Sequence, residues 1–258
     1  MTTQKASIDS ILNTTIWGNG VEIMKSLPSK SVDLICTDPP YNAKNIGPNS
    51  KVYLEGEMQM SQKEYKKFCK EWFKQALRVG KRVIFTPGIA NTHNYPQPWW
   101  QIAWYKPAAT SYNRMGGFNV WEPIFIYGGQ YPGKRITQDY IVRNVVNFKK
   151  TPESRHPCPK QLSLILFIIS KFSKKGDIVM DPMMGSGTTL VACKMLQRRY
   201  VGVDKVMGYK LMTDERLRQE NLEIADEEEK YCEQEKGYRS GRFMLWGVGQ
   251  QIWAQESV

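Results

Sequence analysis

The chain has 258 residues and a hydrophobic share of 41%, enough for one large domain with a proper core. Its formal net charge is +11, but residues 223–258 hold 8 acidic and 4 basic side chains, so the first 222 residues carry +15. A basic body favours a polyanionic partner such as nucleic acid, and a solubilising surface explains the charge equally well. The longest strongly apolar run, 162–169, is too short to cross a bilayer, so we expect neither a membrane span nor a secretion signal.

The cysteines are odd in number and show no CxxC spacing. This pattern predicts neither a disulfide framework nor a metal site. We therefore expect reduced thiols in a cytoplasmic protein.

Strand-like and helix-like runs alternate along the first part of the chain. Their order is 14–17 (strand), from Val21 (helix), 31–36 (strand), 61–78 (helix) and 82–86 (strand). Ser61 is placed to cap the second helix. This alternation predicts a wound α/β sheet.

Residues 87–160 are instead rich in Pro, Gly, Asn and aromatic residues, and regular patterns return after them. The later runs are 161–173 (helix), 177–180 (strand), 188–197 (helix), 200–203 (strand) and a charged helix from Asp214 through Glu235. We predict four parts: a catalytic half (1–105), a target-recognition insertion (106–155), a cofactor-binding half of the same domain (156–222) and an acidic helix with a tail (223–258).

A glycine-containing turn, DPMMGSGTT at 181–189, lies between a predicted strand and a predicted helix. Such a turn lets the backbone approach a ligand closely. An acid about twenty residues later, here Asp204, is where nucleotide-binding sheets hold ribose hydroxyls. Leu190 replaces the third glycine of the dinucleotide fingerprint, which argues against an NAD enzyme; a tight turn with a surface aspartate is the plain structural alternative.

A second motif, Asp38-Pro39-Pro40-Tyr41, directly follows a predicted buried strand. The prolines stop the strand and fix an extended turn. A carboxylate and a fixed carbonyl, from Asp38 and Pro39, can accept both hydrogens of a planar ring amine and localise its lone pair. Tyr41 would stack on the ring. The alternative interpretation of the whole motif is a proline-stiffened turn with a capping aspartate and no role in chemistry.

Three segments in this order resemble the β-class amino-group DNA methyltransferases: SVDLICTDPPYN, then HPCPK at 156–160, then MDPMMGSGTT. The resemblance covers most of residues 14–222. It implies a Rossmann-like α/β fold with a seven-stranded mixed sheet flanked by helices, plus a small, mostly β recognition insertion. It also implies methyl transfer from S-adenosylmethionine to an exocyclic amino group of a flipped-out base in double-stranded DNA.

The resemblance also implies the roles of individual residues. Asp38, Pro39, Pro40 and Tyr41 handle the target base. The cofactor is held by Asp181, Gly185, Ser186, Gly187, Thr188 and Asp204, with Lys160 and Asn19 nearby. Met183, Gln161 and Asn19 depart from the residues usual in the family.

Residues 106–160 hold nine Lys and Arg against three acids, among aromatics. This mixture favours a DNA-contacting segment, whose predicted phosphate ligands are Lys106, Arg114, Lys134, Arg135, Arg143, Lys149 and Lys150. The aromatic residues at 99–127 are interpreted as core rather than as a platform for bases.

Adenine-N6 is favoured over cytosine-N4, because cytosine members of the resembled family more often have serine where this chain has Asp38. Two further functions stay open: methylation of RNA or of a protein glutamine, and DNA-binding regulation without catalysis. Homodimers are common in the resembled family. Pairing with a restriction endonuclease is a further expectation. The residues decide neither this pairing nor whether the source is a bacterium or a phage.

Overall fold

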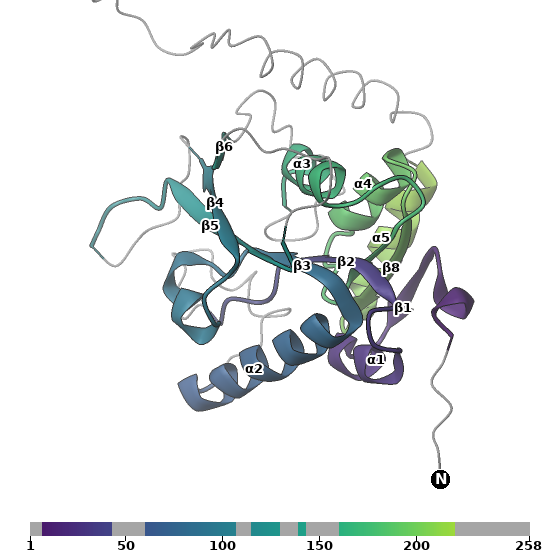
Figure 1. Ribbon diagram of the computed structural model, residues 1–258, viewed down its shortest axis with the longest axis horizontal. Coiled ribbons are helices and arrows are strands. Elements are labelled where there is room, and N and C mark those ends of the chain that lie inside the picture. The colour runs from purple at the N-terminus through teal and green to yellow at the C-terminus, as the bar shows by residue number, and fades with distance from the viewer. Residues whose placement is uncertain (1–6, 43–59, 107–114, 130–138, 143–159, 220–258) are drawn as a thin grey trace, which may run out of the picture. The chain divides into compact units, whose positions relative to one another are not determined.

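A mixed sheet of eight strands lies at the centre of the protein, in the order β1-β8-β7-β2-β3-β5-β4-β6 (Figure 1). The computed structural model describes residues 7–42, 60–106, 115–129, 139–142 and 160–219. The strands are β1 (Thr14–Trp17), β2 (Val32–Thr37), β3 (Gly80–Phe85), β4 (Trp100–Tyr105), β5 (Trp121–Tyr127), β6 (Tyr140–Val142), β7 (Ile178–Asp181) and β8 (Arg199–Asp204). All neighbours pair in parallel except β5, which is antiparallel to both β3 and β4.

Helices cover both faces of the sheet, α1 and α2 on one and α3, α4 and α5 on the other (Figure 1). Their bounds are α1 (Gly20–Ser26), α2 (Gln62–Val79), α3 (Leu162–Phe172), α4 (Thr188–Met195) and α5 (Met207–Gln219), with short 3-10 helices η1 (Ile8–Ile11) and η3 (Ile89–Asn94). Within the described ranges, none of these helices combines the length and the apolar character that a membrane span requires.

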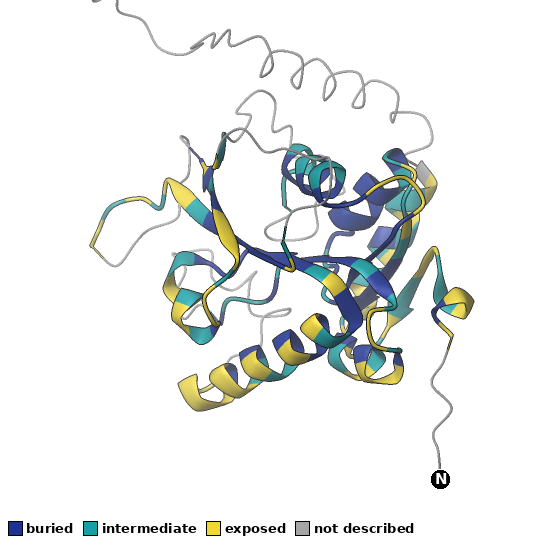
Figure 2. Cartoon of the chain, viewed as in Figure 1, coloured by how far each residue is buried: buried dark blue, intermediate teal, exposed yellow. Residues whose placement is uncertain are grey.

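Helix α2 shows how the sequence pattern produces a packed element. Ser61 and Glu64 form a reciprocal capping box that satisfies donors at the start of the helix. Its buried residues recur at helical spacing and include Tyr65, Trp72 and Ala76. Figure 2 shows the result, with an exposed outer surface on α2 and buried strands at the centre of the sheet.

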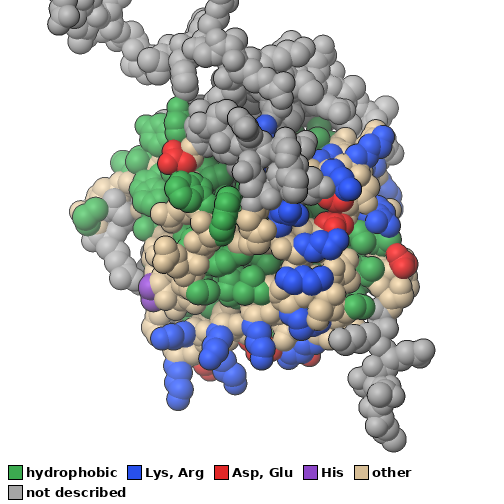
Figure 3. Space-filling view, in the orientation of Figure 1, with side chains coloured by type: hydrophobic (Ala, Val, Ile, Leu, Met, Phe, Trp, Pro, Cys, Tyr) green, Lys and Arg blue, Asp and Glu red, His purple; other side chains and the backbone are tan. Residues whose placement is uncertain are grey.

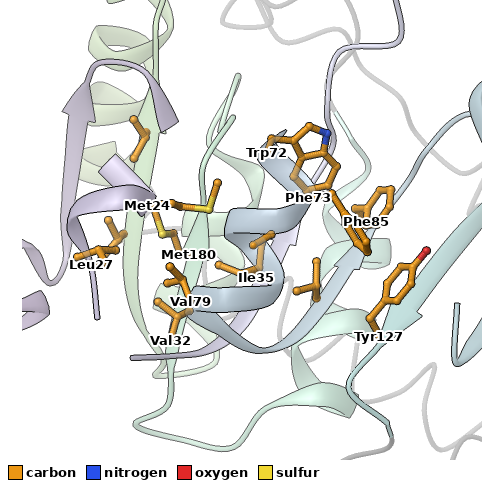
Figure 4. Close-up of a cluster of buried hydrophobic side chains, with 14 of the residues drawn as sticks. Met24, Leu27, Val32, Ile35, Trp72, Phe73, Val79, Phe85, Tyr127 and Met180 are labelled. Atoms are coloured by element: carbon orange, nitrogen blue, oxygen red, sulfur yellow. The ribbon is translucent and has the colours of Figure 1, made fainter. Parts of the chain in front are cut away.

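The core between α1, α2 and the sheet contains a cluster of aromatic rings (Figure 4). Phe73 lies 4.7 Å from Tyr127 between ring centroids, and Trp72 lies 5.0 Å from Phe85 in an edge-to-face arrangement. Such pairs contribute beyond the area they bury. The cluster ties α2 to β3 and β5, and it therefore fixes the position of the loops that leave those strands.

The aromatic residues at 99–127 are divided between core and surface. Trp104, Phe125 and Tyr127 are buried, as predicted, whereas Trp100 and Trp121 are more than two-fifths exposed. The difference follows position along the strand, because Trp100 and Trp121 are the first residues of β4 and β5, whereas the buried rings lie further along these strands.

The predicted mixed α/β sheet flanked by helices is confirmed, but it has eight strands rather than seven. The three-residue β6 pairs with β4 at one edge and is too short to show a periodic pattern. The structure also differs from the predicted insertion at 106–155, because β5 lies within this range and pairs with β3 inside the central sheet. The apolar residues 123–127 of β5 are buried in that sheet and do not form part of a separate lobe.

The last described helix, α5, begins at Met207 rather than at Asp214, and the acidic segment 223–258 lies outside the described residues. Cys36, Cys69 and Cys193 are buried free thiols. In the described part of the chain, no group of three or more His, Cys, Asp or Glu side chains could hold a metal ion.

Candidate active site

Both predicted motifs lie at the carboxyl edge of the sheet, where β2 and β7 are neighbours. β2 pairs with β7 through Leu34 with Val179 and Ile35 with Met180. From this pair the chain continues in opposite directions across the sheet, from β2 to β3 and from β7 to β8. Ligands of open α/β sheets bind at such switch points, outside the carboxyl ends of the strands.

Asp38 follows β2 and is surrounded by three donors. Its Oδ1 accepts hydrogen bonds from the Thr86 and Tyr41 hydroxyls, and the Lys160 ammonium lies 3.1 Å away. All the contacts that described residues make with this carboxylate are at Oδ1. The second oxygen, Oδ2, is thus available to accept a hydrogen from a ligand.

The loop after Asp38 is held from two sides. The Tyr65 hydroxyl donates to the Pro40 carbonyl at 2.9 Å, and the Asn91 amide donates to the Tyr41 carbonyl at 2.9 Å. Among the described residues, none donates to the Pro39 carbonyl. The Pro39 carbonyl is therefore open to a donor from a ligand beside Asp38.

Tyr41 is engaged through its hydroxyl, which donates to Asp38 and accepts from the Lys160 ammonium at 2.7 Å. Burial raises the pKa of Tyr41 well above its usual value, and the neighbouring Asp38 carboxylate adds to this effect. The hydroxyl consequently stays protonated and acts as a donor to Asp38.

The glycine turn after β7 depends on left-handed backbone that glycine tolerates. Gly185 has φ +49° and Gly187 has φ +75°. A Cβ on Gly187 would lie 2.3 Å from Cγ2 of Thr213, so any larger residue would push the turn away from α5. The Gly185 amide donates to Oδ2 of Asp204 at 2.9 Å, which joins this turn to the end of β8.

Asp204 is buried, and its two oxygens accept backbone amides from Gly185 and Val206. Asn19 caps α1 by accepting from the Val21 amide at 2.9 Å. A Cβ on the adjacent Gly20 would lie 2.0 Å from the Pro182 carbonyl oxygen, which shows how closely this cap approaches the glycine turn.

Asp181 lies at the end of β7, where its Oδ1 accepts from the Thr37 hydroxyl at 2.7 Å and the Met183 amide at 3.1 Å. Burial raises its pKa from 3.8 to about 6, although hydrogen bonds from Thr189, Thr37 and Met183 oppose the shift. The carboxylate thus ties the glycine turn to the strand that carries Asp38, and keeping it charged costs folding free energy.

One pocket joins the two motifs, with about 560 Å³ of empty space that includes a part open to solvent. Its lining combines the ends of β2 and β3, one side of α3 and the glycine turn. Of the predicted site residues, it contains Asp38, Lys160, Asp181, Gly185, Ser186 and Thr188. A bound molecule in the turn would therefore share this space with a group held at Asp38.

Lys160 contacts the loop after β2, which its predicted role toward the cofactor did not require. Its ammonium contacts Asp38 and Tyr41 and lies 3.4 Å from Oε2 of Glu122. It also lies 5.1 Å from the centre of the Tyr41 ring. The lysine thereby links the loop after β2 to strand β5.

Lys106 differs from its predicted role as an exposed DNA ligand. It is only 7% exposed, and its ammonium forms an ion pair with Glu122. The reason is its position directly after β4, which ends at the same edge of the sheet as β2 and β3. The other predicted DNA ligands, Arg114, Lys134, Arg135, Arg143, Lys149 and Lys150, lie outside the described residues.

Lys and Arg side chains also gather along the lower edge of the surface in Figure 3, over α2. The exposed lysines of this helix are Lys63, Lys66, Lys67, Lys70 and Lys74. None of them was predicted to contact DNA.

The sequence matches a known protein family over most of its length. A model of the DNA methylase family, whose name specifies N6 and N4 methylation, matches residues 32–215. The chain belongs to this family. The protein is accordingly a DNA methyltransferase, and the resemblance found in the sequence is confirmed.

Curated relatives include two type II methyltransferases. M.HinfI of Haemophilus influenzae is 26% identical over 83% of this chain and 71% of its own length. M.HpaI of Haemophilus parainfluenzae is 28% identical over 84% of this chain and 78% of its own length.

Solved structures show the same fold. M1.HpyAVI, solved as a complex with SAM, has a TM-score of 0.54 and 23% identity over 79% of this chain and 98% of its own. The cytosine-N4-specific PvuII DNA methyltransferase has a TM-score of 0.57 and 16% identity over 82% of this chain and 89% of its own. The family uses S-adenosylmethionine as its methyl donor.

Three residues of this DNA methyltransferase site were not singled out from the sequence. Thr37 and Thr86 occur at the ends of β2 and β3, and a polar residue after an apolar strand run is a usable signal for the edge that carries the site. Glu122 was counted only as one of the few acids in a basic segment. Its position at the start of an otherwise apolar strand was the signal that could have identified it.

The raised pKa of Asp181 predicts a pH-dependent stability that Asp181→Asn removes. As pH rises above 3.8, the unfolded chain releases this proton first, and the folded protein releases it only near pH 6. Stability therefore falls across this window, by about 3 kcal/mol from this group. Urea unfolding at pH 4, 5, 6 and 7 should show that the wild type loses more stability than Asp181→Asn, whose Oδ1 still accepts the Thr37 and Met183 bonds. Parallel pH profiles would contradict the assignment.

Proposed function

We propose that this DNA methyltransferase transfers a methyl group from S-adenosylmethionine to N6 of adenine in double-stranded DNA. The observation that carries the proposal is the shared pocket, in which Asp38 and the glycine turn face the same space. Asp38 supplies a carboxylate whose Oδ1 is already occupied, beside a proline carbonyl that no described residue uses.

The chemical difficulty is the low nucleophilicity of an amino group conjugated with a ring. Oδ2 of Asp38 and the Pro39 carbonyl can each accept one amino hydrogen, which moves electron density onto nitrogen. The three donors at Oδ1 hold the carboxylate in place, so little reorganisation accompanies the reaction. The proton that nitrogen loses after methylation passes to Asp38 or to water.

The glycine turn and Asp204 fit a nucleoside cofactor. The positive φ values of Gly185 and Gly187 bring main chain close to a ligand at the start of α4. Asp204 lies at the end of β8, where it accepts the amide of Gly185 in this turn, and it is the proposed ligand of the ribose hydroxyls. When bound, S-adenosylmethionine supplies a sulfonium methyl group, and its S–CH₃ bond breaks as the N–CH₃ bond forms.

A base within a duplex cannot bring its amino group to Asp38, because this carboxylate is set among buried groups at the edge of the sheet. Its side chain is 30% exposed, and that of Lys160 beside it is 10% exposed. The target nucleotide must therefore leave the helix and enter the pocket. Tyr41, Pro39 and Pro40 would form the side of the pocket that receives the base.

Adenine is favoured over cytosine by Asp38 itself, since cytosine members of the family more often have serine at this position.

Phosphate contacts are assigned to the basic residues Arg114, Lys134, Arg135, Arg143, Lys149 and Lys150. The type II names of the curated relatives support protection of DNA sites against a paired restriction endonuclease in a bacterial cytoplasm. A homodimer is the proposed assembly.

The function is tested by incubating the purified protein with unmethylated genomic DNA and isotope-labelled S-adenosylmethionine. Nucleosides are then separated and identified by mass spectrometry. We expect labelled N6-methyladenine. Labelled N4-methylcytosine would agree with the family but overturn the assignment of adenine as the target base. Absence of label from both nucleosides would overturn the proposed activity.

Asp38→Ala should abolish methyl transfer while leaving the affinity for S-adenosylmethionine near that of the wild type, because the carboxylate faces the base. Methyl transfer is measured in a single turnover and cofactor affinity by calorimetry. Asp9→Ala, which removes an exposed carboxylate in η1, serves as the control and should keep full activity. Equal losses of transfer and cofactor affinity in Asp38→Ala would be incompatible with the role given to Asp38.

Asp204→Ala should weaken cofactor binding by about 10- to 100-fold, since charge-assisted hydrogen bonds to a ribose are lost. Calorimetric titration with S-adenosylmethionine measures the change. An unchanged dissociation constant would remove Asp204 from the cofactor site.

A further inference from the structure

We propose that Glu122 is a positioning residue that holds the ammonium group of Lys160 against Oδ1 of Asp38, so that Oδ2 remains the acceptor for the target amino group. The inference rests on the proposed function, because it concerns the same carboxylate. It gives Lys160 a role toward the base in place of the predicted role toward the cofactor.

Strand direction explains why Glu122 reaches the site. β5 runs antiparallel to β3 and β4, so its first residues lie at the edge where the parallel strands end. Glu122 pairs with Trp104 in the ladder, and its side chain is only 16% exposed. An acid at the second position of an apolar strand is thereby carried into the site without belonging to any of the three motifs.

The contacts form an alternating chain of charges. Oε1 of Glu122 pairs with Lys106, and Oε2 lies 3.4 Å from the ammonium of Lys160. That ammonium lies 3.1 Å from Oδ1 of Asp38. Each carboxylate oxygen of Glu122 thus contacts one lysine, and Lys160 bridges two carboxylates.

Within the described part of this cluster, two ammonium groups face two carboxylates. Burial acts to raise the pKa of Glu122, but the charges and hydrogen bonds of Lys160 and Lys106 outweigh it and hold the pKa below its usual value. Glu122 is therefore ionised at neutral pH. Removing its charge would leave Lys160 paired with Asp38 and would take away the carboxylate that Lys106 contacts, which is unfavourable at low dielectric.

Aromatic rings restrict where the Lys160 ammonium can move. It lies 5.1 Å from the centre of the Tyr41 ring and 5.5 Å from that of Trp104. Together with Glu122 these rings keep it on the Oδ1 side of Asp38. If Glu122 lost its charge, the ammonium would gain by moving toward Oδ2, where it would compete with the target amino group.

The test uses the full-length enzyme and its methylatable DNA. Glu122→Gln preserves shape and removes only the charge. We expect its single-turnover methylation rate to fall on the order of 10- to 100-fold, as for a disturbed electrostatic contact at the reacting group. Its dissociation constant for S-adenosylmethionine should stay within about twofold of the wild type. Glu71→Gln, which removes a charge from an exposed ion pair with Lys25, is the matched control and should keep the wild-type rate.

A second variant separates a charge effect from a packing effect. Lys160→Ala removes the ammonium, and added ethylammonium should restore part of its methylation rate, whereas ethanol should not. Restoration by both compounds or by neither would overturn the electrostatic role. A Glu122→Gln enzyme that loses cofactor affinity in proportion to its rate, or that keeps the wild-type rate, would also overturn it.

The two levels of inference fail differently. If the wild type methylates DNA and Glu122→Gln equals it, the positioning role is wrong and the proposed function stands. If the wild type methylates no DNA, the proposed function is wrong and the positioning role falls with it.

Discussion

The parallel pairing of β2 with β7 is the constraint on which the site depends. Asp38 and Asp181 are far apart in the sequence, yet they lie at the ends of paired strands, and Thr37 donates from one strand end to the carboxylate of the other. This pairing places the loop that carries Asp38 beside the glycine turn. Transfer of a methyl group requires such proximity, because donor and acceptor must be held in line at short distance.

Buried charge is the second feature that shapes the molecule. Asp181, Asp38, Glu122, Lys160 and Lys106 lie at one edge of the sheet, and each is held by hydrogen bonds or ion pairs with other protein groups. Such groups cost free energy to bury, and each depends strongly on its partners. The aromatic core around Phe73 and Phe85 supplies the rigid support that keeps these partners in register.

Local sequence could predict the elements that carry the motifs. The strand before Asp38, the helix that Ser61 caps and the β7-turn-α4 unit all have clear periodicity or punctuation, and the structure places them within a few residues of the predictions. The three motifs, in their order, were sufficient to predict the family. Local patterns could not predict β6 or the place of β5, because strand partners are chosen by contacts between distant segments.

The sequence by itself thus determined the fold class, the family and the residues of the two motifs, since each of these depends on short runs of neighbouring residues. Only the tertiary structure decided that Lys106 is buried, that Lys160 contacts Asp38 and that Glu122 joins them. The physical reason is strand direction. Whether a charged side chain lies at the site or in solvent depends on which end of its strand reaches the carboxyl edge, and the antiparallel course of β5 is fixed by its pairing with β3 and β4.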